Sequence, residues 1–423
     1  MPPFGQIVQS YLQSLPAYFT SRNSWILLAV GALISWQYMR VQRIEVALFG
    51  RPRHALPKRL LFSVIFGVVG GMVGSMLLTG IGIAISSQWI SNVMLCSLLL
   101  ALVDMRLICF AYSGGLLSLG YLLFGWPAID VASLLGLVAV LHMVESVLML
   151  LSGHLGASPL YVRRDDGRVV GGYSLQLFWP LPLLALMVIP QVLPGDGAGI
   201  AMPAWWPLIK PIGAPLSGDF TLYMVPLLAA LGYGDLAVTT SPRRKVRHSA
   251  ARLMLFSLTL LGLAWLGSRH ASLLWLAAIF SPLGHELLIV IGNRQEQTGA
   301  PLWEHKGPGV MIMEVLPGGW AERAGLRPRD VILAVNDAPL TGGLAWREQL
   351  DLVSNAEQAA QLGASLRLAV VRAKGKPFTV TLSARHYADP GLLLVPDADV
   401  ENYVETRFRS PLLWAWRLMK QNR

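Results

Sequence analysis

Long apolar runs, separated by short polar and basic stretches, occupy the chain from Trp25 to Ile291. A run of about 20 mainly apolar residues is long enough to cross a bilayer as a helix. We therefore predict about 8–9 membrane spans, at residues 25–39, 60–85, 90–103, 107–126, 131–151, 175–192, 220–237, 253–266 and 273–291. The run at 25–39 is short, and about eight spans remain if it does not cross.

The hydrophobic pattern changes near residue 293. From 296 to 390, apolar residues form short β-type runs that end at Pro, Gly and Asn turns. The predicted fold class is a polytopic α-helical membrane domain followed by a small, β-rich α/β domain. We divide the chain into an N-terminal segment (1–24), a multi-span transmembrane domain (25–293), the small domain (296–390) and a C-terminal tail (391–423). The pattern at 410–420 predicts an amphipathic helix that docks on the membrane surface or on the small domain.

The stretch from Gly309 to Asn336 carries the most specific motif in the chain. In order, it contains a β-type run at 310–315, the turn Pro317-Gly318-Gly319, a helical turn closed by Gly325, the turn Pro328-Arg329-Asp330 and a second apolar run ending at Asn336-Asp337. This order resembles the PDZ domain in its bacterial form. The family's usual Pro-Gly-Asp stands here as Pro328-Arg329-Asp330, and its usual Asn-Gly as Asn336-Asp337.

The resemblance implies a peptide-binding site. A PDZ domain binds an extended peptide by adding it as a strand to a sheet edge. Backbone N–H groups of the loop containing Gly307 and Gly309 would hold a terminal carboxylate, although Pro308 removes one donor, so an internal segment is the alternative ligand. A plain Gly-Pro-Gly linker is the other interpretation of this loop. The predicted pairing strand consists of Val310, Met311 and Ile312, and Leu350 lies on the predicted opposite wall.

The composition agrees with a membrane protein and explains the net charge. Of 423 residues, 54% are hydrophobic and 14% charged, against about a quarter charged in soluble domains.

The net charge of +10 lies in three basic loops, at 40–59, 160–173 and 242–252. All three fall on one side of the predicted topology, which the positive-inside rule makes cytoplasmic. We therefore predict a multi-pass plasma-membrane protein whose PDZ-like domain faces the cytoplasm. The loops favour anionic lipid, and no nucleic-acid partner is expected.

Polar residues inside the predicted spans are the candidates for chemistry. Membrane spans with a PDZ domain also describe site-2 intramembrane metalloproteases, which need His-Glu-x-x-His. Here Leu287, Leu288 and Ile289 follow His285-Glu286, so the second histidine of this motif is absent, and no nucleotide-binding motif occurs. The remaining intramembrane candidates are His142, three residues before Glu145, and the pair His285 and Glu286. They could join two helices in a four-ligand metal site, or simply form a polar packing contact, which is the interpretation we favour.

No enzyme, metal or cofactor is predicted from these patterns. The two cysteines, Cys96 and Cys109, lie in apolar runs and indicate neither a disulfide framework nor a zinc cluster. In the run at 60–85, Gly67 with Gly71 and Gly70 with Gly74 place small residues on shared helix faces, which permits close helix contact and homo-oligomerisation.

The architecture as a whole, with His142/Glu145 and His285-Glu286, resembles the MinJ-type cell-division topology determinants of Gram-positive bacteria. This resemblance implies a non-enzymatic scaffold that recruits DivIVA-like and MinD-like division proteins and helps to place the division site. The alternative is a transporter or intramembrane enzyme that uses the buried His/Glu residues, with the PDZ domain regulating it.

Overall fold

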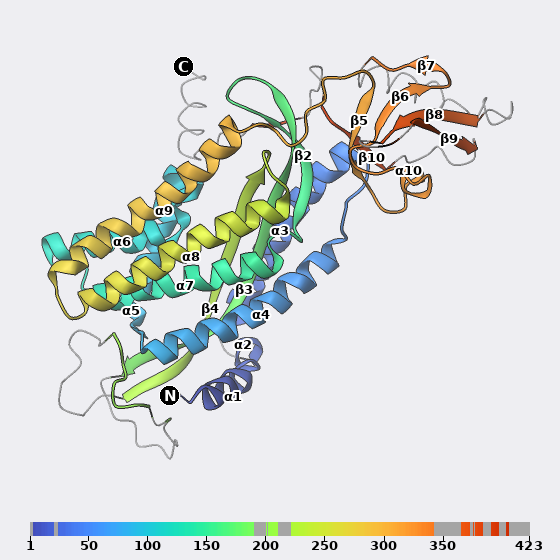
Figure 1. Ribbon diagram of the computed structural model, residues 1–423. Helices are drawn as coiled ribbons and strands as arrows, with labels where there is room; N and C mark the ends of the chain where they lie inside the picture. The colour runs from blue at the N-terminus through green and yellow to red at the C-terminus, as the bar shows by residue number, and fades with distance from the viewer. Residues whose placement is uncertain are drawn as a thin grey trace, which may run out of the picture.

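The computed structural model describes residues 3–20, 24–189, 200, 202–209, 221–341, 365–372, 375, 377–383, 391–396 and 403–405. Leu350 and the predicted tail helix at 410–420 lie outside this part of the chain. Within it, long helices pack on an extended β-hairpin, and a smaller β-rich unit follows at the end of the last long helix (Figure 1).

Four described helices are long and apolar enough to cross a membrane. They are α4 (Leu56–Ile81), α7 (Val131–Ser152), α8 (Pro242–Gly267) and α9 (Ser272–Thr298). The apolar helices α5 (Ser87–Val103) and α6 (Phe110–Phe124) are shorter, and α3 (Ser24–Phe49) is not among the four. Two short helices, α1 (Phe4–Ser14) and α2 (Ala17–Thr20), precede α3. The prediction of about 8–9 spans is therefore not supported.

The clearest error concerns the spans predicted at 175–192 and 220–237. These segments are strands, β3 (Val169–Ile189) and β4 (Thr221–Ala237), which pair antiparallel from Tyr173–Ala237 to Ile189–Thr221. Apolar content alone does not separate a buried strand from a helix. Proline distinguishes the two, because inside a helix it removes a backbone hydrogen bond and clashes with the preceding turn. Proline within an apolar run therefore argues against a helix. β3 contains Pro180 and Pro182, and β4 contains Pro226.

At the prolines of β3, the strand pairs with β4 on one side, and its other edge has no neighbouring strand among the described residues. The amide of Phe178 donates to the Tyr38 hydroxyl at 3.2 Å, and the amide of Leu184 donates to Ser75 Oγ at 2.8 Å. Backbone groups alternate sides along a strand, so Pro180 and Pro182 face this same edge, away from β4. Proline carries no N–H, so neither Pro180 nor Pro182 leaves a donor unpaired at this edge. Only the flanking amides of Phe178 and Leu184 need acceptors, and side chains of α3 and α4 supply them.

Glycines on α4 allow the helix to lie directly on β3. A Cβ on Gly67 would lie 2.1 Å from the Pro180 carbonyl oxygen, and one on Gly71 would lie 2.0 Å from that of Pro182. Gly70 faces Leu148 of α7, and Gly74 faces Leu183 of β3. The small residues that suggested helix self-association are thus all in contact with the chain itself.

The long helices form one layer on this hairpin. α4, α7, α8 and α9 run side by side, with β3 and β4 behind them in Figure 1. α7 is the central helix, and most of its side chains are buried. Strand β2 (Ala157–Arg163) pairs with the start of β3, and the two-residue strands β1 (Ala84–Ile85) and β11 (Val404–Glu405) complete the sheet.

The C-terminal unit is a five-strand path with the order β10-β5-β6-β8-β9. Its strands are β5 (Val310–Val315), β6 (Val331–Val335), β8 (Ser365–Val371), β9 (Pro377–Ser383) and β10 (Leu392–Leu394), and β7 (Ala338–Pro339) pairs with β6. Ile312, Trp320 of the short helix α10 (Trp320–Arg323) and Ile332 lie in its core. Arg329, Asn336 and Asp337 have positive φ angles, as the predicted turns require.

Candidate functional site

The predicted peptide-binding strand lies inside the C-terminal sheet. Ile312 is fully buried and Val310 is 6% exposed, both in the core of the unit, whereas Met311 packs towards the helical part. Gly309 precedes the strand with φ +84°, and a Cβ there would lie 2.4 Å from the Ile332 carbonyl oxygen. Only glycine fits this position. Gly307, earlier in the same loop, is exposed.

Both edges of β5 are already occupied. Val310 and Met311 pair with β6 on one side, while residues 312–315 pair with Leu392–Leu394 of β10 on the other. An arriving peptide would therefore pair with Val310–Ile312 only if β10 left the sheet. As the sheet stands, β10 is the strand at this edge, and strand addition without rearrangement would occur beside it.

The backbone of β10 shows which of its groups face outward. Gly391 and Val395 bond to β5, through Leu316 N to Gly391 O at 2.7 Å and Val395 N to Met311 O at 2.8 Å. Leu394 points the other way, because its carbonyl accepts from the Tyr161 hydroxyl of β2 at 2.8 Å. The Leu394 N–H, on the same side of the strand, faces the outer edge as well.

The C-terminal sheet is docked on the helical part by polar and apolar contacts. Glu314 of β5 meets Arg53 at 3.3 Å and accepts from the Tyr173 hydroxyl at 3.2 Å. Burial raises the pKa of Glu314 above its ordinary value, although Arg53 and the Tyr173 hydrogen bond act against this. Met313 and Leu393 belong to the same apolar core as α7 and β3. The sheet therefore has one face against the hairpin.

A second candidate site lies among the helices. Cys109, His142 and His285 place one ligand atom each within 4.8 Å of one another. Cys109 Sγ lies 3.1 Å from His142 Nε2 and 3.6 Å from His285 Nε2. Cys109 caps the start of α6, His142 lies in the middle of α7, and His285 lies in α9, three residues after Pro282. Three elements that are far apart in sequence thus meet at one point.

The structure brings together the two predicted histidines but not their glutamates. The rings of His142 and His285 are 5.3 Å apart, and Phe256 of α8 packs edge-on against both. Glu286 instead accepts from the Tyr112 hydroxyl at 2.5 Å and lies 3.6 Å from Arg106. Glu145 lies one turn beyond His142 and is not part of the converging group.

Cys109 is the member that the sequence did not reveal. Its place in an apolar run predicts no zinc cluster, whereas in the structure it stands at the break between the 3-10 turn η1 (Met105–Ile108) and α6. The preceding Asp104 caps η1 by accepting from the Arg106 amide at 3.0 Å. The charged pair Asp104 and Arg106 marks this break in the sequence. Cys109 lies directly after the break, and this position is the signal for a site residue.

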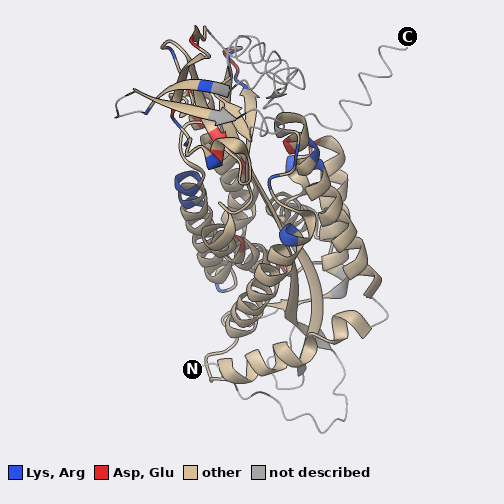
Figure 2. Ribbon diagram, turned by 90° about the vertical axis from the view of Figure 1, so that its right-hand side faces the viewer, with Lys and Arg blue, Asp and Glu red and all other residues tan. Residues whose placement is uncertain are grey.

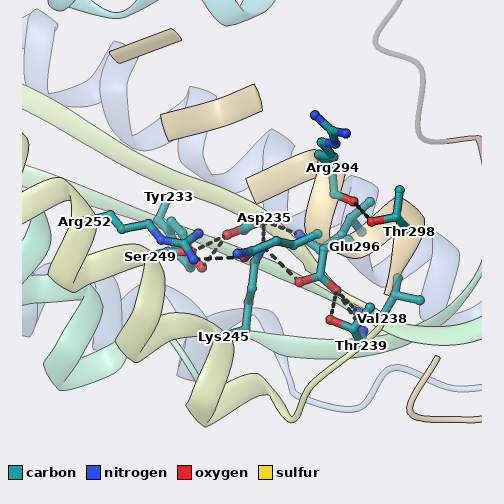
Figure 3. A network of polar contacts seen from close by, with 12 residues as sticks. Tyr233, Asp235, Val238, Thr239, Lys245, Ser249, Arg252, Arg294, Glu296 and Thr298 are labelled. Atoms are coloured by element: carbon teal, nitrogen blue, oxygen red, sulfur yellow. Dashed lines mark hydrogen bonds and ion pairs between the residues drawn. The ribbon is translucent and has the colours of Figure 1, made fainter. Parts of the chain in front are cut away.

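A third polar cluster joins the ends of α8, α9 and β4 (Figure 3). Buried Lys245 lies 3.2 Å from Asp235 and 3.1 Å from Glu296. Glu296 also accepts from the amides of Val238 and Thr239, each at 2.8 Å. The cation has two carboxylate partners and the Glu296 carboxylate accepts from two backbone amides, so this cluster holds the ends of α8, α9 and β4 together.

Comparison with known proteins identifies the C-terminal unit. Residues 311–372 match the PDZ domain family. No curated protein matches the chain. The PDZ assignment therefore stands on the sequence motif, the family match and the observed sheet, and it indicates binding of protein partners. The helical part has four helices that could span a membrane.

Proposed function

We propose that the protein is a non-enzymatic membrane scaffold that recruits protein partners through its PDZ domain. The observation that carries this proposal is the PDZ sheet, which docks on the β-hairpin of a chain with four possible membrane helices and ends in the short edge strand β10. Confinement to a membrane raises the effective concentration of the domain towards other membrane-bound proteins. Backbone pairing at the edge would supply affinity, and neighbouring side chains would supply specificity.

The proposed membrane topology is multi-pass, in the plasma membrane, with the PDZ domain in the cytoplasm. Charged residues gather at the end of the molecule that carries the PDZ sheet, while most of the ribbon towards the N-terminal helix is uncharged (Figure 2). Arg51 and Arg53 of the first basic loop contact the sheet directly. The positive-inside rule favours a cytoplasmic location for that end.

The proposed process is division-site placement or cell polarity, with DivIVA-like and MinD-like proteins as partners. This finer assignment rests on the resemblance to MinJ-type proteins. Fluorescence imaging of the tagged full-length protein in its own host tests it. A band at mid-cell or foci at the poles would support the assignment, and an even stain of the whole membrane would contradict it.

Partner capture can be tested at the Leu394 backbone. Leu394→Pro removes an outward N–H while keeping the bonds that Gly391 and Val395 make with β5. Leu394→Ala is the matched control, because it shortens the side chain and keeps the N–H. We expect pull-downs with full-length protein from host membranes to lose partners with the proline variant and to keep them with the alanine variant. Equal recovery with both would contradict strand addition beside β10.

A transporter or intramembrane enzyme remains the second candidate, and the meeting of His142 and His285 favours it. Under that hypothesis His142→Ala abolishes an activity while the amount of protein and its cellular location stay unchanged. Under the scaffold hypothesis the same change alters folding or partner location only.

A further inference from the structure

We propose that Cys109, His142 and His285 form a binding site for a divalent transition metal ion, with Zn²⁺ as its ligand. Thiolate and imidazole together are the donor set that Zn²⁺ takes in proteins. The site lies in the helical part and goes beyond partner recruitment by the PDZ domain.

The distances between the ligand atoms fit a tetrahedral ion. With a Zn–S bond of about 2.3 Å and a Zn–N bond of about 2.0–2.1 Å, tetrahedral angles place sulfur and nitrogen about 3.6 Å apart. The observed distance from Cys109 Sγ to His285 Nε2 is 3.6 Å, and that to His142 Nε2 is 3.1 Å. A movement of a few tenths of an ångström at His142, on the order of ordinary side-chain adjustment, would complete the geometry.

The surroundings orient two of the three ligands, His142 and Cys109, as metal sites require. His142 Nδ1 lies 2.7 Å from the Val138 carbonyl oxygen, one turn earlier on α7, so Nδ1 carries the proton and Nε2 presents its lone pair. The amide of Ala111 donates to Cys109 Sγ at 3.4 Å from the first turn of α6. Phe256 packs against both imidazoles and keeps that side dry.

The enclosure differs between the three ligands. His142 is 4% exposed, whereas Cys109 and His285 are only half-buried. Cys109 and His285 therefore form the outer side of the site, and His142 forms its floor. Three protein ligands leave one tetrahedral position for a water molecule or another oxygen donor, as in catalytic zinc sites. A bound ion would also fasten the start of α6 to α7 and α9.

The competing arrangement is a metal-free hydrogen-bonded trio, in which the Cys109 thiol donates to His142 and His285 donates to the sulfur. Both arrangements use the same three side chains. They differ in metal content, so the test is whether the full-length protein holds zinc through these residues.

The first experiment measures zinc per chain in the full-length protein, purified in detergent, equilibrated with Zn²⁺ and then freed of loose metal. We expect one zinc ion per chain in the wild type and in Cys96→Ser, which alters the other free cysteine. Cys109→Ser, His142→Ala and His285→Ala should bind Zn²⁺ on the order of 10–100-fold more weakly or worse. A zinc-free wild type, or zinc content unchanged in all three variants, would overturn the proposal.

The second experiment needs no destabilising variant. Replacement of Zn²⁺ by Co²⁺ in the wild type should produce a near-ultraviolet thiolate-to-cobalt charge-transfer band together with the visible bands of a tetrahedral ion. The same spectrum should appear with Cys96→Ser. If Co²⁺ binds without the charge-transfer band, Cys109 is not a ligand and the proposed site is wrong.

Discussion

At the scale of single residues, buried Glu45 holds the junction between α3, α4 and β2. It is fully buried and forms a close ion pair with Arg59. It also accepts from the Ser158 hydroxyl at 2.8 Å and from the Arg53 amide at 3.0 Å. Such a carboxylate is stable only because its donors replace the water it has lost.

Replacement of Glu45 by alanine should therefore destabilise the protein strongly. Arg59, itself 8% exposed, would keep a buried charge without a carboxylate partner. Loss of one member of a buried ion pair costs about 3–5 kcal/mol. The free energy of unfolding in mixed detergent micelles measures this cost.

The double variant Glu45→Leu/Arg59→Met is the control for the Glu45 prediction. It removes both charges, and we expect it to recover most of the loss, since apolar replacement of a whole buried pair is often neutral. A single variant as stable as the wild type would show that water reaches Arg59.

At the scale of elements, the contact between α4 and β3 depends on glycines that leave no room for a side chain. A Cβ at position 71 would overlap both the Pro182 carbonyl and the Tyr11 hydroxyl. We expect Gly71→Ala to cost about 1–3 kcal/mol or more through forced separation of helix and strand.

The matched control is Gly262→Ala in α8, where a Cβ meets nothing within 4 Å. That change should be neutral or stabilising, by up to about 1 kcal/mol, because alanine favours a helix more than glycine does. Both variants can be compared by thermal unfolding in the same detergent. Equal melting temperatures would contradict the close packing of α4 on β3.

The elements that could be predicted from the sequence are those encoded locally. The turn residues Pro317-Gly318, Asp330 and Asn336 lie within one stretch of the chain, and they predicted the strands that became β5 and β6. The helices α4, α7, α8 and α9 followed from apolar length alone. β3 and β4 could not be predicted in this way, because their apolar residues also fit a membrane helix. The two strands pair with each other although residues 190–220 separate them in the chain. Pro180, Pro182 and Pro226 are the local sign that these segments are not helices.

The candidate sites were predictable only in part, for the same reason. His142 and His285 stood out as polar residues in apolar helices, but their meeting with Cys109 depends on how α6, α7 and α9 pack. The pairing of β10 with β5 joins residues that are nearly 80 positions apart along the chain. No local pattern at Leu392–Leu394 identified that strand as the edge of the PDZ sheet.

At the scale of the whole molecule, docking of the PDZ sheet should depend on pH through Glu314. The raised pKa means that the folded protein favours the protonated carboxyl. The stability that this group contributes is fully present below its ordinary pKa of 4.5 and is lost as pH rises through the higher folded value. Deprotonation leaves a desolvated charge whose partners, Arg53 and Tyr173, do not fully offset the burial.

Comparison with Glu314→Gln isolates this contribution. We expect the melting temperature of the wild type, relative to that variant, to fall as pH rises from about 4 to about 8. Glu322→Gln, on the exposed side of the PDZ domain, controls for loss of a surface carboxylate. The difference in melting temperature between the wild type and this variant should change less with pH. A difference that grows with pH would mean that Arg53 dominates over burial.

If partners bind by the proposed strand addition beside β10, the hydrogen bond from Tyr161 to Leu394 links docking and partner binding thermodynamically. A strand that pairs beside β10 would approach the Leu394 carbonyl from the side on which the Tyr161 hydroxyl lies, so the two would compete for the same position at this edge. Linkage is reciprocal: what loosens the sheet from β2 must tighten partner binding, and a bound partner must loosen the sheet by the same free energy.

Tyr161→Phe should therefore raise partner affinity, by about 2–10-fold for a hydrogen bond of about 0.5–1.5 kcal/mol. Under the proposed mode of binding, the helical part would act as a competitive ligand of its own PDZ domain, and partner concentration would set how often the domain is released.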